Sequence, residues 1–559
     1  MKKFRPSKPE LLYTLKNYNK KKFTADLMAG IIVGIVALPL AIAFGIASGV
    51  SPEKGILTAI IAGFAISVFG GSRVQIGGPT GAFIIIIYGI IQEYGLTGLA
   101  IATALAGLFL ILLGVLKLGT IIRYIPYPII VGFTSGIALT IFSTQVKDLL
   151  GLHIEGAVPA DFIEKWACYI QNFSTIDLAT AMVGILSVVI IALTPLISKK
   201  IPGSLVAIIV MTVAGIIMST HFGIHVDTIG DRFEINPSMP EATVPELSWD
   251  NIKGLFAPAL TIAVLGAIES LLSATVADGI IGHRHDSNQE LIGQGIANVL
   301  SPIFGGIPAT GAIARTMTNI NNGGKTPIAG VIHAAVLLLI YFFLMPYAKY
   351  IPMACLAGVL VVVSYNMSGW RTIREMIHNP KSDLTVLILT FVLTVIFDLT
   401  IAIEVGLLLA CLLCMRRMAE TTQVKVLTDE DDIDPTAETD IAKNPNIEHL
   451  TIPEDVEVYE INGPYFFGVA SKFEEVIANM KARPKVRIIR MRKVPFVDST
   501  GIHNLTTLIK MSKKENIKVI LSGVNEYVHE VLEKNGFYEL IGEENICPNI
   551  NVALEKAKQ

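Results

Sequence analysis

Charged residues and cysteines are both scarce in this 559-residue chain. Only 16% of the residues are charged, whereas 52% are hydrophobic and the mean hydropathy is +0.60. The net charge of −3 leaves no basic excess that would indicate a nucleic-acid partner. The five cysteines form no disulfide or metal-ligand framework; Cys411 and Cys414 are spaced like a ligand pair but fall in an apolar stretch. This composition indicates a polytopic membrane protein with a soluble part attached.

Apolar runs follow one another from about residue 27 to residue 415 and predict fourteen membrane segments. They cover approximately residues 27–49, 55–70, 79–93, 98–117, 128–146, 178–197, 203–220, 255–276, 289–303, 309–321, 327–346, 353–367, 383–397 and 400–417. Seven segments precede the 220–252 loop and seven follow it. A repeat with an odd number of segments inserts upside down relative to its copy, so we expect an inverted repeat of residues 24–220 and 253–418.

Charge placement predicts the orientation of these segments. The N-terminal tail, residues 1–23, carries eight basic residues and is therefore expected in the cytoplasm. With fourteen spans the C-terminus lies inside as well. The long loops 147–177 and 221–252 then lie outside, and both are mainly acidic. We expect a multi-pass protein of the cytoplasmic membrane in which the lipid bilayer is the solvent.

The last part of the chain reads as soluble. Residues 419–446 include a run rich in acidic side chains and predict a solvated linker. From residue 447 to residue 559, strand-like runs alternate with amphipathic helical patterns. That alternation predicts a small cytoplasmic α/β domain.

Two short segments, in corresponding positions of the two halves, interrupt the apolar pattern. Residues 77–82 read GGPTGA and residues 305–312 read GGIPATGA. Paired helix-breaking segments of this kind point to the substrate site of a transporter. A helix that begins in mid-membrane presents free N–H groups and about +0.5 charge, so two facing helix starts suit an anion. The candidate anion-binding residues are Gly78, Thr80, Gly81, Ala82, Thr310, Gly311, Ala312 and Arg315.

Thr80 and Thr310 stand where the two half-helices are expected to begin. Threonine is a favoured N-cap residue, because its hydroxyl can accept a hydrogen bond from an N–H group of the first turn. We therefore predict that both threonines cap their half-helices. This role is compatible with anion binding by the N–H groups that follow.

Two charged residues fall inside predicted segments, namely Glu269 and Arg315. A charge at mid-membrane costs about 2.5–3.5 kcal/mol on insertion scales, so we expect each of the two residues to have a structural or functional role. They could form a structural ion pair, or Arg315 could attract the anion while Glu269 carries the coupling charge. A carboxylate about 6 Å from an anion repels it by roughly 3 kcal/mol at an effective dielectric constant near 20. Anion binding would then require Na⁺ or H⁺ at a coupling site formed by Glu269, Ser273 and Gly311.

Several motifs together resemble the sulfate permease (SulP) family of anion transporters with a C-terminal STAS domain. In the membrane part these are ALPLAIAFG at residues 37–45, QELIGQGIAN at 289–298, and Arg315-Thr316 followed by GGKT at 323–326. In the soluble part they are GPYFFG at 463–468 and VDSTG at 497–501. The surroundings of Glu269 are most similar to the sodium–bicarbonate branch, which has Asp at that position.

The resemblance implies a seven-plus-seven inverted repeat with core and gate domains, a homodimer, and elevator-like movement of the core. It implies an anion held between segments three and ten. Ser499 matches a serine that can be phosphorylated in regulatory STAS proteins, although residues 498–499 could simply cap a helix. A cytoplasmic protein partner at the STAS domain is a further expectation.

The leading hypothesis is a secondary active transporter of a small inorganic anion, either sulfate, the family default, or bicarbonate. A transporter of C4-dicarboxylates or other organic anions remains open, as does a non-transporting membrane sensor or scaffold that acts through STAS. The sequence contains no nucleophile–base constellation, phosphate loop or metal-ligand spacing. We therefore expect no enzyme, and no cofactor other than Na⁺ or H⁺ as a coupling ion.

Overall fold

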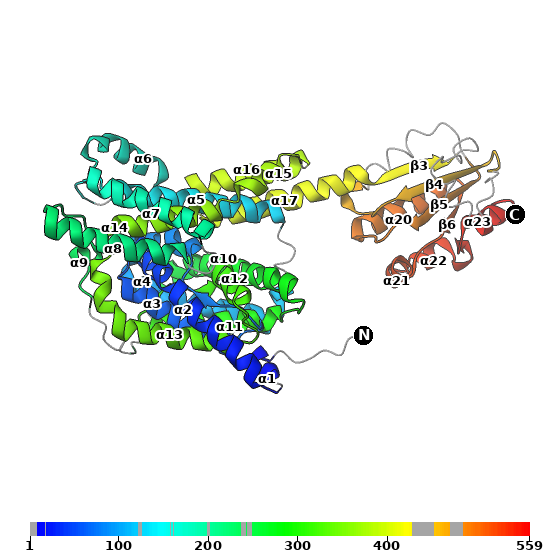
Figure 1. Ribbon diagram of the computed structural model, residues 1–559. Helices are drawn as coiled ribbons and strands as arrows, with labels where there is room; N and C mark the ends of the chain where they lie inside the picture. Colours follow the sequence, from blue (N-terminus) through cyan, green and yellow to red (C-terminus); the bar gives the residue numbers. More distant parts are fainter. Residues whose placement is uncertain are drawn as a thin grey trace. The chain divides into compact units, whose positions relative to one another are not determined.

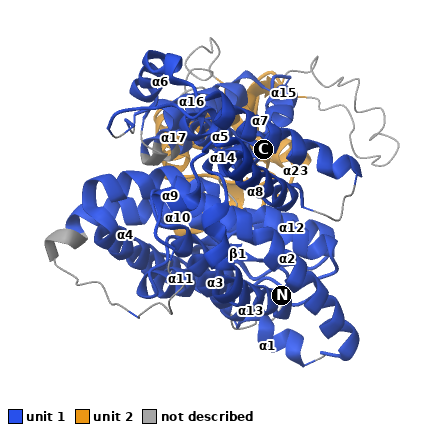
Figure 2. Cartoon of the chain, turned by 60° about the vertical axis from the view of Figure 1, so that its left-hand side comes forward, with its two compact units in different colours: residues 1–408 blue, residues 409–559 orange. Residues whose placement is uncertain are grey.

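The computed structural model describes residues 8–16, 18–120, 126–156, 158–159, 161–197, 202–235, 242, 249–378, 380–397, 399–427, 452–469 and 484–559. The chain divides into two compact units, Met1–Leu408 and Leu409–Gln559 (Figure 2). Each unit is described by itself below.

Unit 1 is helical, and each of the fourteen predicted segments has a helical counterpart (Figure 1). Its helices are α1 (Glu10–Leu15), α2 (Lys20–Ala47), α3 (Pro52–Phe69), η1 (Gly81–Phe83), α4 (Ile84–Val115), α5 (Tyr127–Leu150), α6 (Phe162–Gln171), η3 (Phe173–Thr175), α7 (Leu178–Ile197), α8 (Gly203–Phe222), α9 (Ile229–Arg232), α10 (Trp249–Ile281), α11 (Ser287–Ile303), α12 (Ile313–Asn321), α13 (Ile328–Leu344), η4 (Met345–Tyr350), α14 (Met353–Met367), α15 (Trp370–Met376) and α16 (Lys381–Ile396), while α17 (Leu399–Thr421) runs across the unit boundary. Nine helices of the described chain are long and apolar enough to cross a membrane. Predicted segments three and four are both contained in α4, which is interrupted at Gly95 by non-helical φ and ψ values of 68° and −172°.

The helices of unit 1 pack in two groups. Helices α2, α3, α4, α10, α11 and α13 pack mainly against one another, and α5, α7, α8, α14 and α16 form the second group. These groups correspond to the predicted core and gate. Alanine-rich and glycine-rich faces allow the closest approaches, as is common between membrane helices. At the crossing of α4 and α11, a Cβ on Gly107 would lie 2.6 Å from the carbonyl oxygen of Gly295, and a Cβ on Gly295 would lie 2.5 Å from that of Gly107.

Two very short strands connect the two repeats. Strand β1 (Gly77–Gly78) pairs antiparallel with β2 (Thr310–Gly311), with Gly77 opposite Gly311 and Gly78 opposite Thr310. β1 lies among the helices of unit 1 (Figure 2). The two segments predicted to break their helices therefore meet, and each leads into a helix start.

Unit 2 contains a five-stranded sheet with the order β3-β4-β5-β6-β7. The strands are β3 (Gln423–Leu427), β4 (Val456–Asn462), β5 (Val486–Lys493), β6 (Lys518–Ser522) and β7 (Ile546–Cys547). β3 pairs antiparallel with β4 and the other neighbours pair in parallel. The helices of this unit are α20 (Ser499–Lys514), α21 (Glu526–Lys534), α22 (Phe537–Ile541), η5 (Glu543–Asn545) and α23 (Ile550–Ala557). The predicted α/β domain is confirmed.

The predicted start of the acidic linker at residue 419 is wrong. Helix α17 continues to Thr421, and residues 423–427 form the edge strand β3. Val424 and Val426 pack against the buried cluster of the domain, so this short stretch belongs to the sheet although its sequence also contains polar residues. Residues 428–446 of the predicted linker lie outside the described residues.

Replacing Gly295 by leucine is expected to push α11 away from α4, because the new side chain would overlap the backbone of Gly107. Overpacking of this kind costs about 1–3 kcal/mol or more. We expect a lower midpoint of thermal unfolding and a smaller monodisperse fraction in size-exclusion chromatography. The control is Gly279→Leu in α10, where a Cβ would meet no atom within 4 Å. Equal stability of the two variants would contradict the packing described here.

Candidate functional site

A cavity of about 530 Å³, here called the central cavity, lies where the two broken segments meet. It is bounded by residues of α2, α5, α10 and α14 together with residues 79–81 and 311–315. Of the predicted site residues, the cavity is lined by Thr80, Gly81, Glu269, Gly311, Ala312 and Arg315. Gly78, Ala82, Thr310 and Ser273 do not line it. The structure thus brings together the predicted helix starts and both predicted charges.

The backbone around β1 and β2 is held by hydrogen bonds between the two repeats and within the second one. The N–H of Ala312 donates to the carbonyl oxygen of Ile76 at 2.9 Å. The N–H of Gly311 donates to Oγ of Ser270 at 3.1 Å, and Ser270 Oγ lies 2.6 Å from Thr310 Oγ1. Ser270, next to Glu269 in α10, was not predicted; a serine on an apolar helix gives no signal of its own because it usually bonds back to its helix.

The polar face of α12 holds the segment that precedes β1. Oγ1 of Thr316 accepts a hydrogen bond from the N–H of Ile76 at 3.1 Å, and Nδ2 of Asn319 donates to the carbonyl oxygen of Val74 at 2.8 Å. Both side chains are buried. Their three-residue spacing places them on one helix face, and this spacing is the sequence feature that could have indicated their role.

The predicted capping role of the two threonines is wrong. Thr80 precedes η1 without a side-chain cap bond, and α12 begins after Ala312 rather than Thr310. Oγ1 of Thr80 instead donates to Oε2 of Glu269 at 2.9 Å, and Oγ1 of Thr310 donates to the carbonyl oxygen of Gly266 at 2.9 Å. Both hydroxyls therefore link a broken segment to α10. The hydroxyl of Thr80 donates its proton to a buried carboxylate, and such charge-assisted hydrogen bonds are stronger than neutral ones.

Arg315 is 2% exposed and has few protein partners. Its Nη1 lies 3.5 Å from the carbonyl oxygen of Gly77, and Nη2 has no hydrogen-bond partner among the described residues. Glu269 is not within 4 Å of it, so the two charges do not form the structural ion pair considered from the sequence. A buried guanidinium with a free N–H group can offer a charge-assisted hydrogen bond to an anion.

Ser273 lies one turn beyond Glu269 but belongs to a different contact. Its hydroxyl is buried and donates to Oγ1 of Thr316 at 3.4 Å. It therefore faces α12 rather than the central cavity, and the structure does not bring it together with Glu269 as a ligand pair.

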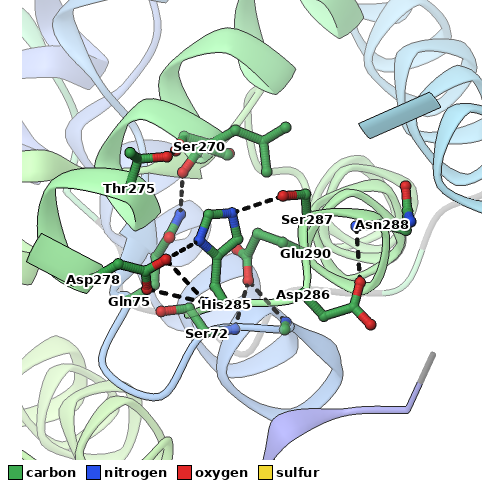
Figure 3. Close-up of polar contacts among 12 residues, drawn as sticks. Ser72, Gln75, Ser270, Thr275, Asp278, His285, Asp286, Ser287, Asn288 and Glu290 are labelled. Carbon is green, nitrogen blue, oxygen red and sulfur yellow. Dashed lines mark hydrogen bonds and ion pairs between the residues drawn. The ribbon is translucent and has the colours of Figure 1, made fainter. Parts of the chain in front are cut away.

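A second polar network fixes the loop that leads into β1 (Figure 3). The carboxylate of Glu290, in α11, accepts hydrogen bonds from the N–H groups of Gly71 and Ser72 at 2.8 and 3.0 Å. Nearby, His285 Nδ1 lies 2.7 Å from Asp278 Oδ2 and its Nε2 lies 3.0 Å from Ser287 Oγ. Glu290 belongs to the QELIGQGIAN motif, so this part of the motif serves to position the chain before β1.

One group of potential metal ligands lies away from the central cavity. His225, Asp227 and Asp231 are exposed and have ligand atoms within 4.8 Å of one another. Asp227 already pairs with Arg232 at 3.2 Å, and Asp231 Oδ2 accepts the N–H of Thr228 at 2.7 Å. These hydrogen bonds from Thr228 hold the pKa of Asp231 below its usual value. The carboxylates thus have protein partners, and we assign no metal to them.

In unit 2, Ser499 is the first residue of α20 and is exposed. The helix is capped by Asp498, whose Oδ1 accepts the N–H of Gly501 at 2.8 Å and whose Oδ2 accepts the N–H of Phe467 at 3.0 Å. Ser499 is therefore not the cap of the helix. Its phosphorylation stays a prediction.

The fold defines a polytopic membrane transporter with a soluble α/β domain. The model of the sulfate permease family matches residues 23–390, and the STAS domain model matches residues 449–553. The chain belongs to the sulfate permease family. Members of this family are transporters, so the chain is not an enzyme.

Individual relatives agree with this assignment. The chain is 42% identical to the putative sulfate transporter YvdB of Bacillus subtilis over 95% of this chain and 97% of the relative. It is 29% identical to the bicarbonate transporter BicA of Picosynechococcus sp. over 96% of this chain and 95% of the relative. Among solved structures, the transmembrane domain of a cyanobacterial BicA matches with a TM-score of 0.63 at 32% identity, covering 70% of this chain and 98% of that one. Murine Slc26a9 shares the fold with a TM-score of 0.88 at 20% identity, covering 99% and 94%.

Gly78 is a position where the site tolerates little change. A Cβ on Gly78 would overlap Nη1 of Arg315, and its φ of +156° also disfavours other residues. We expect Gly78→Ala to displace the guanidinium and to weaken anion binding by roughly tenfold or more, which corresponds to about 1.4 kcal/mol. Binding can be followed by isothermal titration of the purified protein with sulfate and with bicarbonate, with Gly279→Ala as the control. Unchanged affinity in Gly78→Ala would show that Arg315 does not need its present position.

Proposed function

We propose that this chain transports a small inorganic anion, sulfate or bicarbonate, across the cytoplasmic membrane by secondary active transport. The observation that carries the proposal is the free Nη2 of buried Arg315 in a cavity that also receives both helix starts. The first N–H groups of η1 and α12 have no intrahelical acceptors. An anion between Gly81 and Ala312 would meet two partial positive charges and one full positive charge.

Glu269 is the natural coupling residue. Its carboxylate lines the same cavity and has a single described donor, Thr80, with no cation within 4 Å. While ionised, it would repel an anion about 6 Å away by roughly 3 kcal/mol at an effective dielectric constant near 20. Neutralisation by Na⁺ or H⁺ removes this repulsion, so anion and cation are expected to bind together.

The two cations make different demands on the site. A proton needs only the carboxylate of Glu269. Sodium, a hard cation, needs several oxygen ligands. Glu269 and Thr80 supply two side chains with oxygen atoms, whereas Ser273 is engaged by Thr316. A sodium site would therefore have to draw on nearby backbone carbonyls, with Gly311 as the predicted contributor.

The cavity also supports a mechanism of alternating access. Its lining extends to Tyr127 at the start of α5 and to Thr372 in α15, both on the side that we expect to face the cytoplasm. At its other end, Phe44 and Ile141 pack close to Gly81. Movement of the core group relative to the gate group would expose Gly81 and Ala312 to the opposite side. This elevator-type movement, and the homodimer implied by the family resemblance, are parts of the proposal.

The proposal is tested by uptake into proteoliposomes. Labelled sulfate and bicarbonate are offered separately, with an inward Na⁺ gradient or a pH gradient, to the wild type and to Glu269→Gln. We expect one gradient to drive uptake of one anion in the wild type and the variant to lose that dependence, because its side chain no longer titrates or carries charge. The matched control is Glu93→Gln, which changes an exposed glutamate in α4.

The alternatives give different results. Driven uptake of a C4-dicarboxylate in place of both inorganic anions would assign the chain to organic anions. No uptake of any of these anions would favour a sensor or scaffold that acts through STAS. Retention of the ion dependence by Glu269→Gln would remove Glu269 from the coupling site.

A further inference from the structure

A second cavity, here called the outer cavity, is lined like the central cavity by residues of α2, α5 and α14. It has a volume of about 300 Å³, at the lower end of the range for ligand pockets. Residues 127–134 of α5 line the central cavity, whereas residues 140–148 of the same helix line the outer one. Because an α-helix rises about 1.5 Å per residue, the two cavities follow one another along the axis of α5. The outer cavity lies toward the loops that we expect outside the cell.

Two apolar side chains lie between the residues that line the two cavities. Ile141 is fully buried and Phe44 is 6% exposed. Both lie close to Gly81, where an added Cβ would be 3.0 Å from Cδ1 of Ile141 and 3.4 Å from Cε1 of Phe44. Gly81 belongs to the half-helix start that we propose as part of the anion site. It therefore lies next to the two side chains between the cavities.

Lys165 is the unusual feature of the outer cavity. It belongs to α6, which lies over α5 and α7 in Figure 1, and it lines the cavity while being only 5% exposed. No carboxylate of the described residues lies within 4 Å of its ammonium group. Burial lowers the pKa of Lys165, and the charge of Asp161 opposes this shift. A buried cation without a counter-ion is costly, and an anion bound beside it would remove that cost.

The remaining charges of the cavity do not neutralise Lys165. Its other charged lining residues are Lys147, Asp148 and Arg232. Arg232 pairs with Asp148 at 2.8 Å and with Asp227 at 3.2 Å, so its group carries one excess negative charge against the two positive charges of Lys147 and Lys165. Lys147 has no ion pair among the described residues. The two lysines therefore leave the outer cavity electropositive.

The outer cavity also has a route to solvent. A larger cavity of about 1060 Å³, lined mostly by residues of the two predicted outer loops, shares Lys147, Asp148, Arg232 and Met353 with it. An anion arriving from outside would pass from this larger cavity to the outer cavity, and then meet the layer formed by Phe44 and Ile141.

We propose that Lys165, together with Lys147, forms an outer binding site for a small inorganic anion, which collects the substrate before it reaches the central cavity. The inference deepens the proposed function and depends on it for the identity of the anion. The ligand of this site is the oxyanion that is transported. Chloride is the alternative anion that the same two lysines could bind.

The transport test uses proteoliposomes in which uptake from the outer face and release from the inner face are measured separately. For Lys165→Gln we expect the KM for external anion to rise roughly tenfold, because one attractive charge is lost, with the kcat for uptake and the internal KM unchanged. Lys165→Arg should restore the external KM. The matched control is Lys349→Gln, an exposed lysine of η4 outside both cavities. An unchanged external KM in Lys165→Gln, with the wild type active, would overturn the outer site and leave the proposed function standing.

A binding test is independent of transport. Trp166 packs against Tyr169, which lines the outer cavity, with ring centroids 6.0 Å apart. With Trp249→Phe and Trp370→Phe, Trp166 is the sole tryptophan of the chain. We expect iodide to quench its fluorescence saturably with Lys165 or Arg at this position, and only linearly in Lys165→Gln. Competition by sulfate or bicarbonate would identify substrate, and competition by chloride alone would overturn the role in substrate collection. Identical quenching of all variants would overturn the site, even if the wild type transported nothing.

Discussion

The pairing of β1 with β2 is the constraint on which the rest of the membrane unit depends. Each strand has only two residues, yet the pair joins the two repeats and fixes where η1 and α12 begin. Non-helical backbone is tolerated at membrane depth only where other protein groups or a cavity satisfy it. Here the partner segment, Ser270 and Thr316 supply these bonds. The N–H groups at the starts of η1 and α12 can therefore face the central cavity.

The same arrangement explains why the site holds two charges that do not pair. The lack of a side chain at Gly78 leaves room for the guanidinium of Arg315, and Glu269 accepts a hydrogen bond from the hydroxyl of Thr80. A mutual ion pair would have neutralised both groups and left nothing for a ligand. Separate charges in one cavity are what the proposed joint binding of an anion and a cation requires. In that proposal, the energetic cost of each buried charge serves transport.

Much of this could be predicted from the sequence, because long apolar runs and their interruptions are strong signals. The sequence predicts the fourteen segments and the two broken ones. It also predicts that Glu269 and Arg315 lie at one site. The partner of Thr80 could not be predicted, because a threonine before a helix fits a cap as well as a distant carboxylate. Ser270 and strand β3 were missed for a related reason: their roles come from tertiary contacts, which short polar or mixed stretches do not encode locally.

The central claim is that an anion binds between the two helix starts beside Arg315. The most direct measurement is to locate selenate, a heavier analogue of sulfate, by anomalous scattering in crystals of the full-length protein. We expect a selenium peak in the central cavity between Gly81 and Ala312, within hydrogen-bonding distance of Nη2 of Arg315. Selenate bound elsewhere, with this position empty at saturating concentration, would contradict it.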